Sequence, residues 1–133
     1  MSGRAVMSQP SVVMDVRDLT ASAAFWGRLL GVEPGKPRSN GDYLTVGPLA
    51  SGVALVLQRV DDPRQVKNRV HLDFTVDDIE SAVQLILELG GSRLEKQFTV
   101  SGETMADPDG NEFCIAAYTR DAQGERVEPT SGP

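Results

Sequence analysis

Hydrophobic and polar positions follow the same order in two stretches of the chain. In each stretch, a short β-branched apolar run predicts a strand, and apolar residues at the spacing of one helix face come next. Further apolar runs, separated by turns that contain glycine and proline, predict additional strands. The first stretch therefore predicts a strand, a helix, a loop or ragged strand, and two more strands over residues 12–16, 19–30, 32–41, 43–46 and 53–60.

The second stretch predicts a strand, a helix and three further strands over residues 70–76, 79–89, 93–100, 103–106 and 112–118. Asp18 and either Asp77 or Asp78 stand where helix N-caps belong. Trp26 falls on the apolar stripe of the first helix, which indicates core packing. The Asp-Pro-Asp-Gly segment at 107–110 predicts a turn with solvated acids.

The two stretches match at an offset of sixty residues, which pairs Val16 with Val76 and Asp18 with Asp78. Duplication of a βαβββ module explains this match, and each module alone would leave one sheet face uncovered. We therefore predict an α+β fold whose two modules form an incomplete eight-stranded barrel-like sheet around a cleft, with the helices outside. Within this single structural domain the modules span 11–62 and 66–120, and flexible termini span 1–10 and 121–133.

Alternation along the strand at 70–76 predicts a polar face that lines the cleft. His71, Asp73 and Thr75 share this face, and the repeat offset adds Asp15 to the same cleft. A histidine with nearby carboxylates can act as a general acid or base, so His71 is the candidate catalytic residue. The same group could also hold a cationic ligand.

Structural roles for these residues are the alternatives. His71 could serve only as a hydrogen-bonding residue, and Asp73 could form a surface ion pair with Lys67 or Arg69. Cys114 fits a small buried apolar residue better than a nucleophile, because the chain has no second histidine to activate it.

Several motifs resemble those of the vicinal oxygen chelate superfamily, and most of all its glyoxalase-like bacterial subgroup. Val-Arg-Asp-Leu at 16–19 with Phe-Trp at 25–26 carries the resemblance in the first module. His-Leu-Asp-Phe-Thr-Val-Asp-Asp-Ile at 71–79 and Asp-Pro-Asp-Gly-Asn-Glu-Phe at 107–113 carry it in the second. This superfamily includes glyoxalase I, extradiol dioxygenases, fosfomycin-resistance transferases and bleomycin-binding proteins.

The resemblance implies four metal-ligand positions, which fall on Ser11, Gln58, His71 and Cys114. Only His71 is a strong ligand among them, and Glu112 could substitute for Cys114 by a shift of register. The implied metal set is therefore His71, Gln58 and Glu112, and the implied ligand-binding residues are Asp15, Gln58, Asp73, Glu112 and Cys114. Because the set is incomplete, we expect no cofactor; the alternative is one divalent metal, Ni, Mn, Fe, Zn or Mg.

Charge and residue counts narrow the function classes. Thirteen Lys and Arg against nineteen Asp and Glu give a net charge of −6, which disfavours binding to nucleic acids. No apolar run is long enough to span a membrane. One cysteine fits a reducing compartment, and we expect a cytoplasmic location.

The sequence favours a glyoxalase-like protein that binds a small organic molecule in the cleft between the modules. It lacks the full set of metal ligands, and whether it catalyses a reaction is open. One alternative is a metal-dependent lyase, isomerase or dioxygenase of the vicinal oxygen chelate type. Another is a protein-interaction module without a ligand. The resemblance also implies a homodimer.

Overall fold

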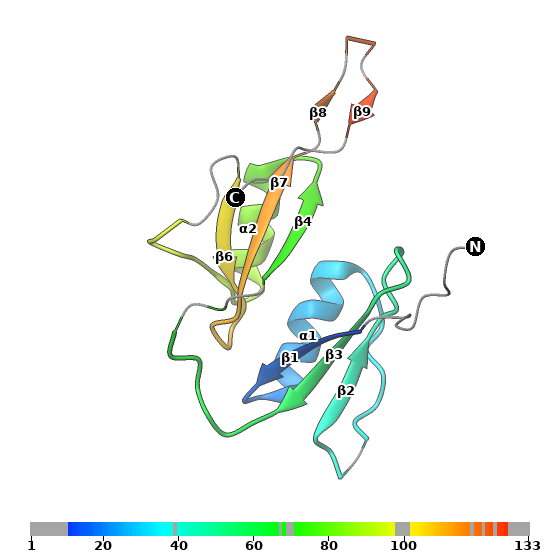
Figure 1. Ribbon diagram of the computed structural model, residues 1–133, viewed down its shortest axis with the longest axis vertical. Helices are drawn as coiled ribbons and strands as arrows, with labels where there is room; N and C mark the ends of the chain where they lie inside the picture. The colour runs from blue at the N-terminus through cyan, green and yellow to red at the C-terminus, as the bar shows by residue number, and fades with distance from the viewer. Residues whose placement is uncertain are drawn as a thin grey trace, which may run out of the picture. The chain divides into compact units, whose positions relative to one another are not determined.

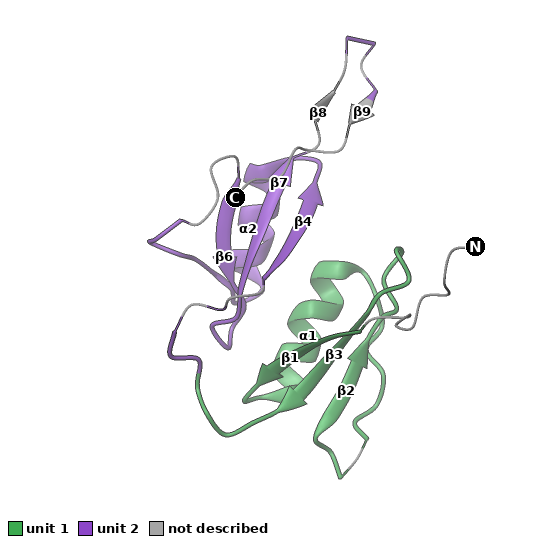
Figure 2. Ribbon diagram, viewed as in Figure 1, with its two compact units in different colours: residues 1–63 green, residues 64–133 purple. Residues whose placement is uncertain are grey.

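Two compact units, Met1–Pro63 and Arg64–Pro133, make up the chain (Figure 2). The computed structural model describes residues 11–38, 40–66, 68, 71–97, 102–117, 119–120, 122–123 and 125–127. Each unit contains one helix and its own mixed sheet, so the predicted α+β class with two modules is confirmed (Figure 1). The eight-stranded barrel-like sheet and the cleft between the modules stay predictions.

Unit 1 contains β1 (Ser11–Val16), α1 (Leu19–Leu30), β2 (Tyr43–Val46) and β3 (Ala54–Arg59). The strand order is β1-β3-β2, with β1 parallel and β2 antiparallel to the central β3. α1 packs on β2 and β3 and buries Trp26 completely, which confirms its predicted core role. The rings of Phe25 and Trp26 meet edge to face at 5.2 Å.

The fourth strand of the first module is reduced to two isolated bridges, Pro34 with Val46 and Arg38 with Tyr43. Between these bridges, the amide nitrogen of Gly35 donates a hydrogen bond of 2.8 Å to the carbonyl oxygen of Thr45. Pro34 and Pro37 have no N–H group, so a continuous ladder cannot form here. The three-stranded sheet of unit 1 follows from these two prolines.

Unit 2 contains β4 (Leu72–Val76), α2 (Ile79–Glu88), β5 (Ser92–Arg93), β6 (Glu103–Ala106) and β7 (Glu112–Ala117). The strand order is β4-β7-β6-β5, with β4 parallel to β7. Phe74 and Phe113 meet edge to face at 5.9 Å, and Ile86 of α2 is fully buried. The expected strand at 93–100 is present only as β5, and residues 98–100 lie outside the described part.

A short ladder after β7 was not predicted. β8 (Thr119–Arg120) and β9 (Arg126–Val127) pair antiparallel in the segment next to and within the expected flexible C-terminus. The expected flexible leader, 1–10, lies outside the described residues, as does the end of the chain from 128.

The turn between β6 and β7 corrects one expectation, that its acids are solvated. Asp107 is 2% exposed. Its Oδ1 accepts from the amides of Asn111 at 2.8 Å and Asp109 at 3.0 Å, and its Oδ2 accepts from Asn111 Nδ2 at 3.2 Å. A buried carboxylate is tolerated because these donors replace water.

Gly91 allows the chain after α2 to pass close to the helix and the sheet. A Cβ at this position would lie 2.6 Å from Ile86 Cγ2 and 2.7 Å from the carbonyl oxygen of Ala106. We expect Gly91→Ala to lower the free energy of unfolding by about 1–3 kcal/mol, as overpacking does. Gly35→Ala is the control, because its Cβ would lie 3.4 Å from the nearest atom, the carbonyl oxygen of Thr45. Chemical denaturation measures both, and equal stabilities would contradict the close approach.

Asp78 caps α2 through its carboxylate, which accepts from the Ser81 hydroxyl at 2.6 Å and the Ser81 amide at 2.9 Å. The Ser81 hydroxyl, followed by the amide, lowers the pKa of Asp78. The cap therefore stabilises the fold fully above the ordinary carboxyl pKa of about 3.9, and this stabilisation is lost as pH falls through the lower folded value.

We expect Asp78→Ala to melt at a lower temperature than wild type at neutral pH, and the gap to narrow as the pH falls below about 4. Melting curves across an acid pH series measure this. Asp77→Asn removes a neighbouring carboxylate but leaves the cap, and should not reproduce the pattern. A gap independent of pH would show that the carboxylate charge does not matter.

Candidate functional site

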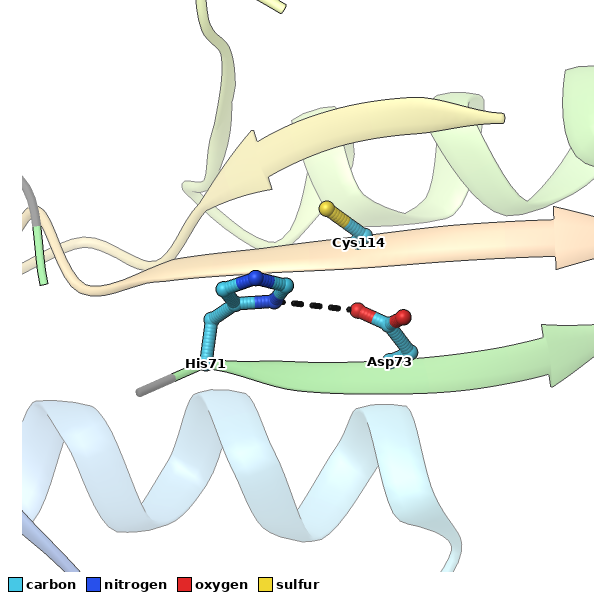
Figure 3. Close-up of side chains that lie close together, drawn as sticks. All are labelled: His71, Asp73 and Cys114. Atoms are coloured by element: carbon cyan, nitrogen blue, oxygen red, sulfur yellow. Dashed lines mark hydrogen bonds and ion pairs between the residues drawn. The ribbon is translucent and has the colours of Figure 1, made fainter. Parts of the chain in front are cut away.

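The polar face of unit 2 brings a histidine and a carboxylate together (Figure 3). His71 immediately precedes β4, and Asp73 follows two residues later on the same face, as predicted. His71 Nδ1 lies 3.1 Å from Asp73 Oδ1, and the two side chains are 23% and 39% exposed. An ionised carboxylate only accepts hydrogen bonds, so the neutral ring must carry its proton on Nδ1. The pair is therefore both ordered by a contact and open to solvent.

Cys114 joins this pair through the register of the sheet. The parallel ladder places Asp73 opposite Cys114, so both side chains belong to one face. A ring nitrogen of His71, a carboxylate oxygen of Asp73 and Cys114 Sγ all lie within 4.8 Å of one another. Figure 3 shows the three side chains on neighbouring strands, on the same side of the sheet.

The thiol lies at the buried end of this cluster. Cys114 is 5% exposed, and its Sγ lies 3.5 Å from Thr104 Oγ1. Thr104 is opposite Cys114 in the β6–β7 ladder and is itself 1% exposed. Thr104 was not among the site residues predicted from the sequence; the signal for it is the antiparallel register across the turn at 107–110.

Glu112 is turned toward the segment that leads into β4. Its carboxylate is 5% exposed, accepts from the amide of Asn68 at 2.9 Å and lies 3.6 Å from Arg64 Nη1. Among the described residues, it is not a member of the His71–Asp73–Cys114 cluster. Glu112 therefore fixes the backbone three residues before His71.

The site residues predicted in the first module lie in unit 1. Asp15 on β1 and Gln58 on β3 are neighbours in the parallel ladder, and Ser11 begins β1. Asp15 is exposed and Gln58 is half-buried. The ion pair suggested for Asp73 with Lys67 or Arg69 lies outside the described residues, and Asp73 contacts His71.

Each unit also has a surface hollow. The larger, about 780 Å³, lies in unit 1 between α1 and the segment that follows it; small residues such as Ala23, Ala24 and Gly27 line it. The smaller, about 290 Å³, lies in unit 2, beside Glu112 and Arg64. No helix in the described part of the chain has the length and apolar character to cross a membrane.

We expect the neutral His71 ring to be the Nδ1–H tautomer, because Asp73 accepts that proton. The chain has one histidine, so nitrogen-15 spectra at mildly alkaline pH report its two ring nitrogens without ambiguity. In Asp73→Ala the Nδ1–H form should lose its preference, and Asp77→Asn should keep it. An Nε2–H tautomer in the wild-type protein would contradict the contact.

Comparison with known proteins supports the resemblance. The family model described as a glyoxalase-like domain matches residues 11–116. No functionally curated protein matches. Among solved structures, a glyoxalase/bleomycin resistance protein from Albidiferax ferrireducens has 20% identity and a TM-score of 0.60, over 82% of this chain and 97% of that one. The fosfomycin resistance protein FosX from Listeria monocytogenes has 17% identity and a TM-score of 0.67, over 84% and 92%.

Proposed function

Because the chain belongs to the family of glyoxalase-like domains, we propose that it binds a small organic molecule on the polar face of unit 2, without the full set of metal ligands. The single observation that supports this function is the His71–Asp73 pair, joined at 3.1 Å and partly open to solvent. A histidine ring that a carboxylate orients and that solvent can reach is able to hydrogen-bond to a bound molecule. Cys114 and Thr104 continue this polar patch into the interior.

The pair supplies one hydrogen-bonding group with a defined direction. The Asp73 carboxylate accepts the Nδ1 proton and orients the ring, which leaves Nε2 to accept a hydrogen bond or a proton from a bound molecule. If the protein is an enzyme, this is the arrangement of a general base whose orientation a carboxylate fixes. The carboxylate also favours ligands that carry a cationic or hydroxyl group.

The second candidate is a metal-dependent lyase, isomerase or dioxygenase that uses His71 with Gln58 and Glu112. It is less well supported, because the Glu112 carboxylate already interacts with Asn68 and Arg64. A ligand role for Glu112 would require it to give up both contacts in a nearly buried position. Asp15 and Gln58 stay proposed ligand contacts from unit 1.

The assembly and location inferred from the sequence also stay predictions. We propose that the chain forms a homodimer, that its partner is a small molecule rather than a nucleic acid or a membrane, and that it works in the cytoplasm. Light scattering coupled to size exclusion tests the dimer, and a monomer at micromolar concentration would reject it.

The function is tested with a panel of cationic and aromatic metabolites and the carbon-bound proton signals of the single histidine. We expect at least one compound to shift these signals. Titration calorimetry should show that it binds His71→Ala about tenfold or more weakly, which is the cost of one hydrogen bond to a charged group. Asp77→Asn, an exposed acid directly after the same strand, is the control for general disturbance of β4. Binding that is equally tight in His71→Ala would reject this site, and no binder in the panel would favour the protein-interaction alternative.

A further inference from the structure

We propose that His71, Asp73 and Cys114 form a binding site for a thiophilic divalent cation of the Zn²⁺ class. All three ligands come from unit 2, and they include a carboxylate and a thiol in place of the predicted Gln58 and Glu112. The inference rests on the proposal that this face binds ligands, but cation binding is measured without any organic molecule. The cation site can therefore be confirmed or rejected independently of the proposed function.

The spacing of the three donor atoms suits a small tetrahedral ion. In such a site, bonds of about 2.0–2.1 Å to nitrogen and oxygen place these two atoms about 3.3 Å apart. His71 Nδ1 and Asp73 Oδ1 lie at 3.1 Å, so a cation can replace the shared proton with little movement. The third atom, Cys114 Sγ, lies within 4.8 Å of a ring nitrogen of His71 and of a carboxylate oxygen of Asp73. Rotation of the two partly exposed side chains can close the remaining gap.

The chemistry of the donors selects the class of cation. One imidazole nitrogen, one carboxylate oxygen and one sulfur atom suit Zn²⁺ and similar borderline ions, whereas Mg²⁺ and Mn²⁺ prefer oxygen ligands alone. The nearest predicted hard donor in unit 2, Glu112, is held by Asn68 and Arg64 instead. Three protein ligands leave a fourth position for water or a bound molecule, as in catalytic zinc sites.

The surroundings of Cys114 fit a thiolate bound to a cation. Coordination to the cation removes the proton of the thiol outright. The Thr104 hydroxyl lies 3.5 Å from Sγ and can donate a hydrogen bond to the thiolate. Both residues are nearly inaccessible, so the sulfur atom stays fixed between β4 and β6.

This arrangement changes the assessment made from the sequence. His71 was the only strong ligand at the positions that the resemblance implied, and on that ground we expected no cofactor. The resemblance implied both Asp73 and Cys114 as ligand-binding residues and Cys114 also as a metal position, although Cys114 fitted a small buried apolar residue as well. The parallel register places Cys114 opposite Asp73, and three donors of unit 2, His71 included, gather in one cluster.

Titration of the full chain with Co²⁺, under reducing conditions and after chelator treatment, tests the site directly. We expect a near-ultraviolet band from charge transfer between thiolate and cobalt, together with the strong visible bands of a tetrahedral ion. Added Zn²⁺ should remove these bands, and Mg²⁺ should not. The single cysteine of the chain makes the sulfur assignment unambiguous.

Variants divide the effect among the ligands. Cys114→Ser should lose the charge-transfer band, and His71→Ala and Asp73→Asn should each bind Co²⁺ at least about tenfold more weakly, a loss that even outer partners of metal ligands can cause. Asp77→Asn, an exposed acid at the other end of β4, is the matched control and should bind normally. Melting temperatures show that each variant folds.

Three results would overturn the inference. The first is a wild-type titration without a charge-transfer band. The second is a band that persists in Cys114→Ser, and the third is an affinity for Co²⁺ that falls equally in Asp77→Asn, since each of the last two would indicate unspecific binding. If Co²⁺ binds as expected but no organic compound does, the cation site stands and the proposed function fails. If an organic compound binds but Co²⁺ does not, the proposed function stands and the cation site is rejected.

Discussion

The parallel register of β4 and β7 is the constraint on which the candidate site depends. It places Asp73 opposite Cys114 and, on the other face, Phe74 opposite Ile115. A slip by one residue would turn every side chain of β4 to the opposite face, so that Phe74 would leave the core and Asp73 would enter it. The edge-to-face contact between Phe74 and Phe113 therefore stabilises the arrangement of the polar face as well as the core.

A second constraint acts on the segment before β4. Glu112 is nearly buried, and a buried carboxylate without partners is strongly disfavoured. The Asn68 amide and Arg64 satisfy it, and the entry to β4 is thereby fixed on the end of β7. Loss of Arg64 would leave the Glu112 charge without a counter-ion and loosen the backbone that leads to His71. Glu112, which the sequence suggested as a metal ligand, thus supports the backbone next to the candidate site.

Much of this could be predicted from sequence, because local patterns determine it. Asp18 and Asp78 cap the two helices as expected, and the alternation along β4 separated Phe74 from His71 and Asp73 correctly. What the sequence missed depends on pairing between strands. The role of Thr104, the interactions of Glu112 and the burial of Asp107 follow from registers and turn hydrogen bonds that no local pattern contains. Pro34 and Pro37 did signal the ragged fourth strand of the first module.

The two modules share a scaffold but differ in their chemistry. By the repeat offset, Ser11 and Val13 of β1 correspond to His71 and Asp73. Val13 is 53% exposed and offers neither charge nor a hydrogen bond, and Ser11 is a weak ligand as a neutral hydroxyl. Both modules keep the strand, capped helix and paired strands that bury an apolar face, whereas among the described residues the His-Asp-Cys cluster occurs in unit 2. Folding requires the repeated apolar positions in both modules, so polar positions in one module are free to diverge without loss of the core.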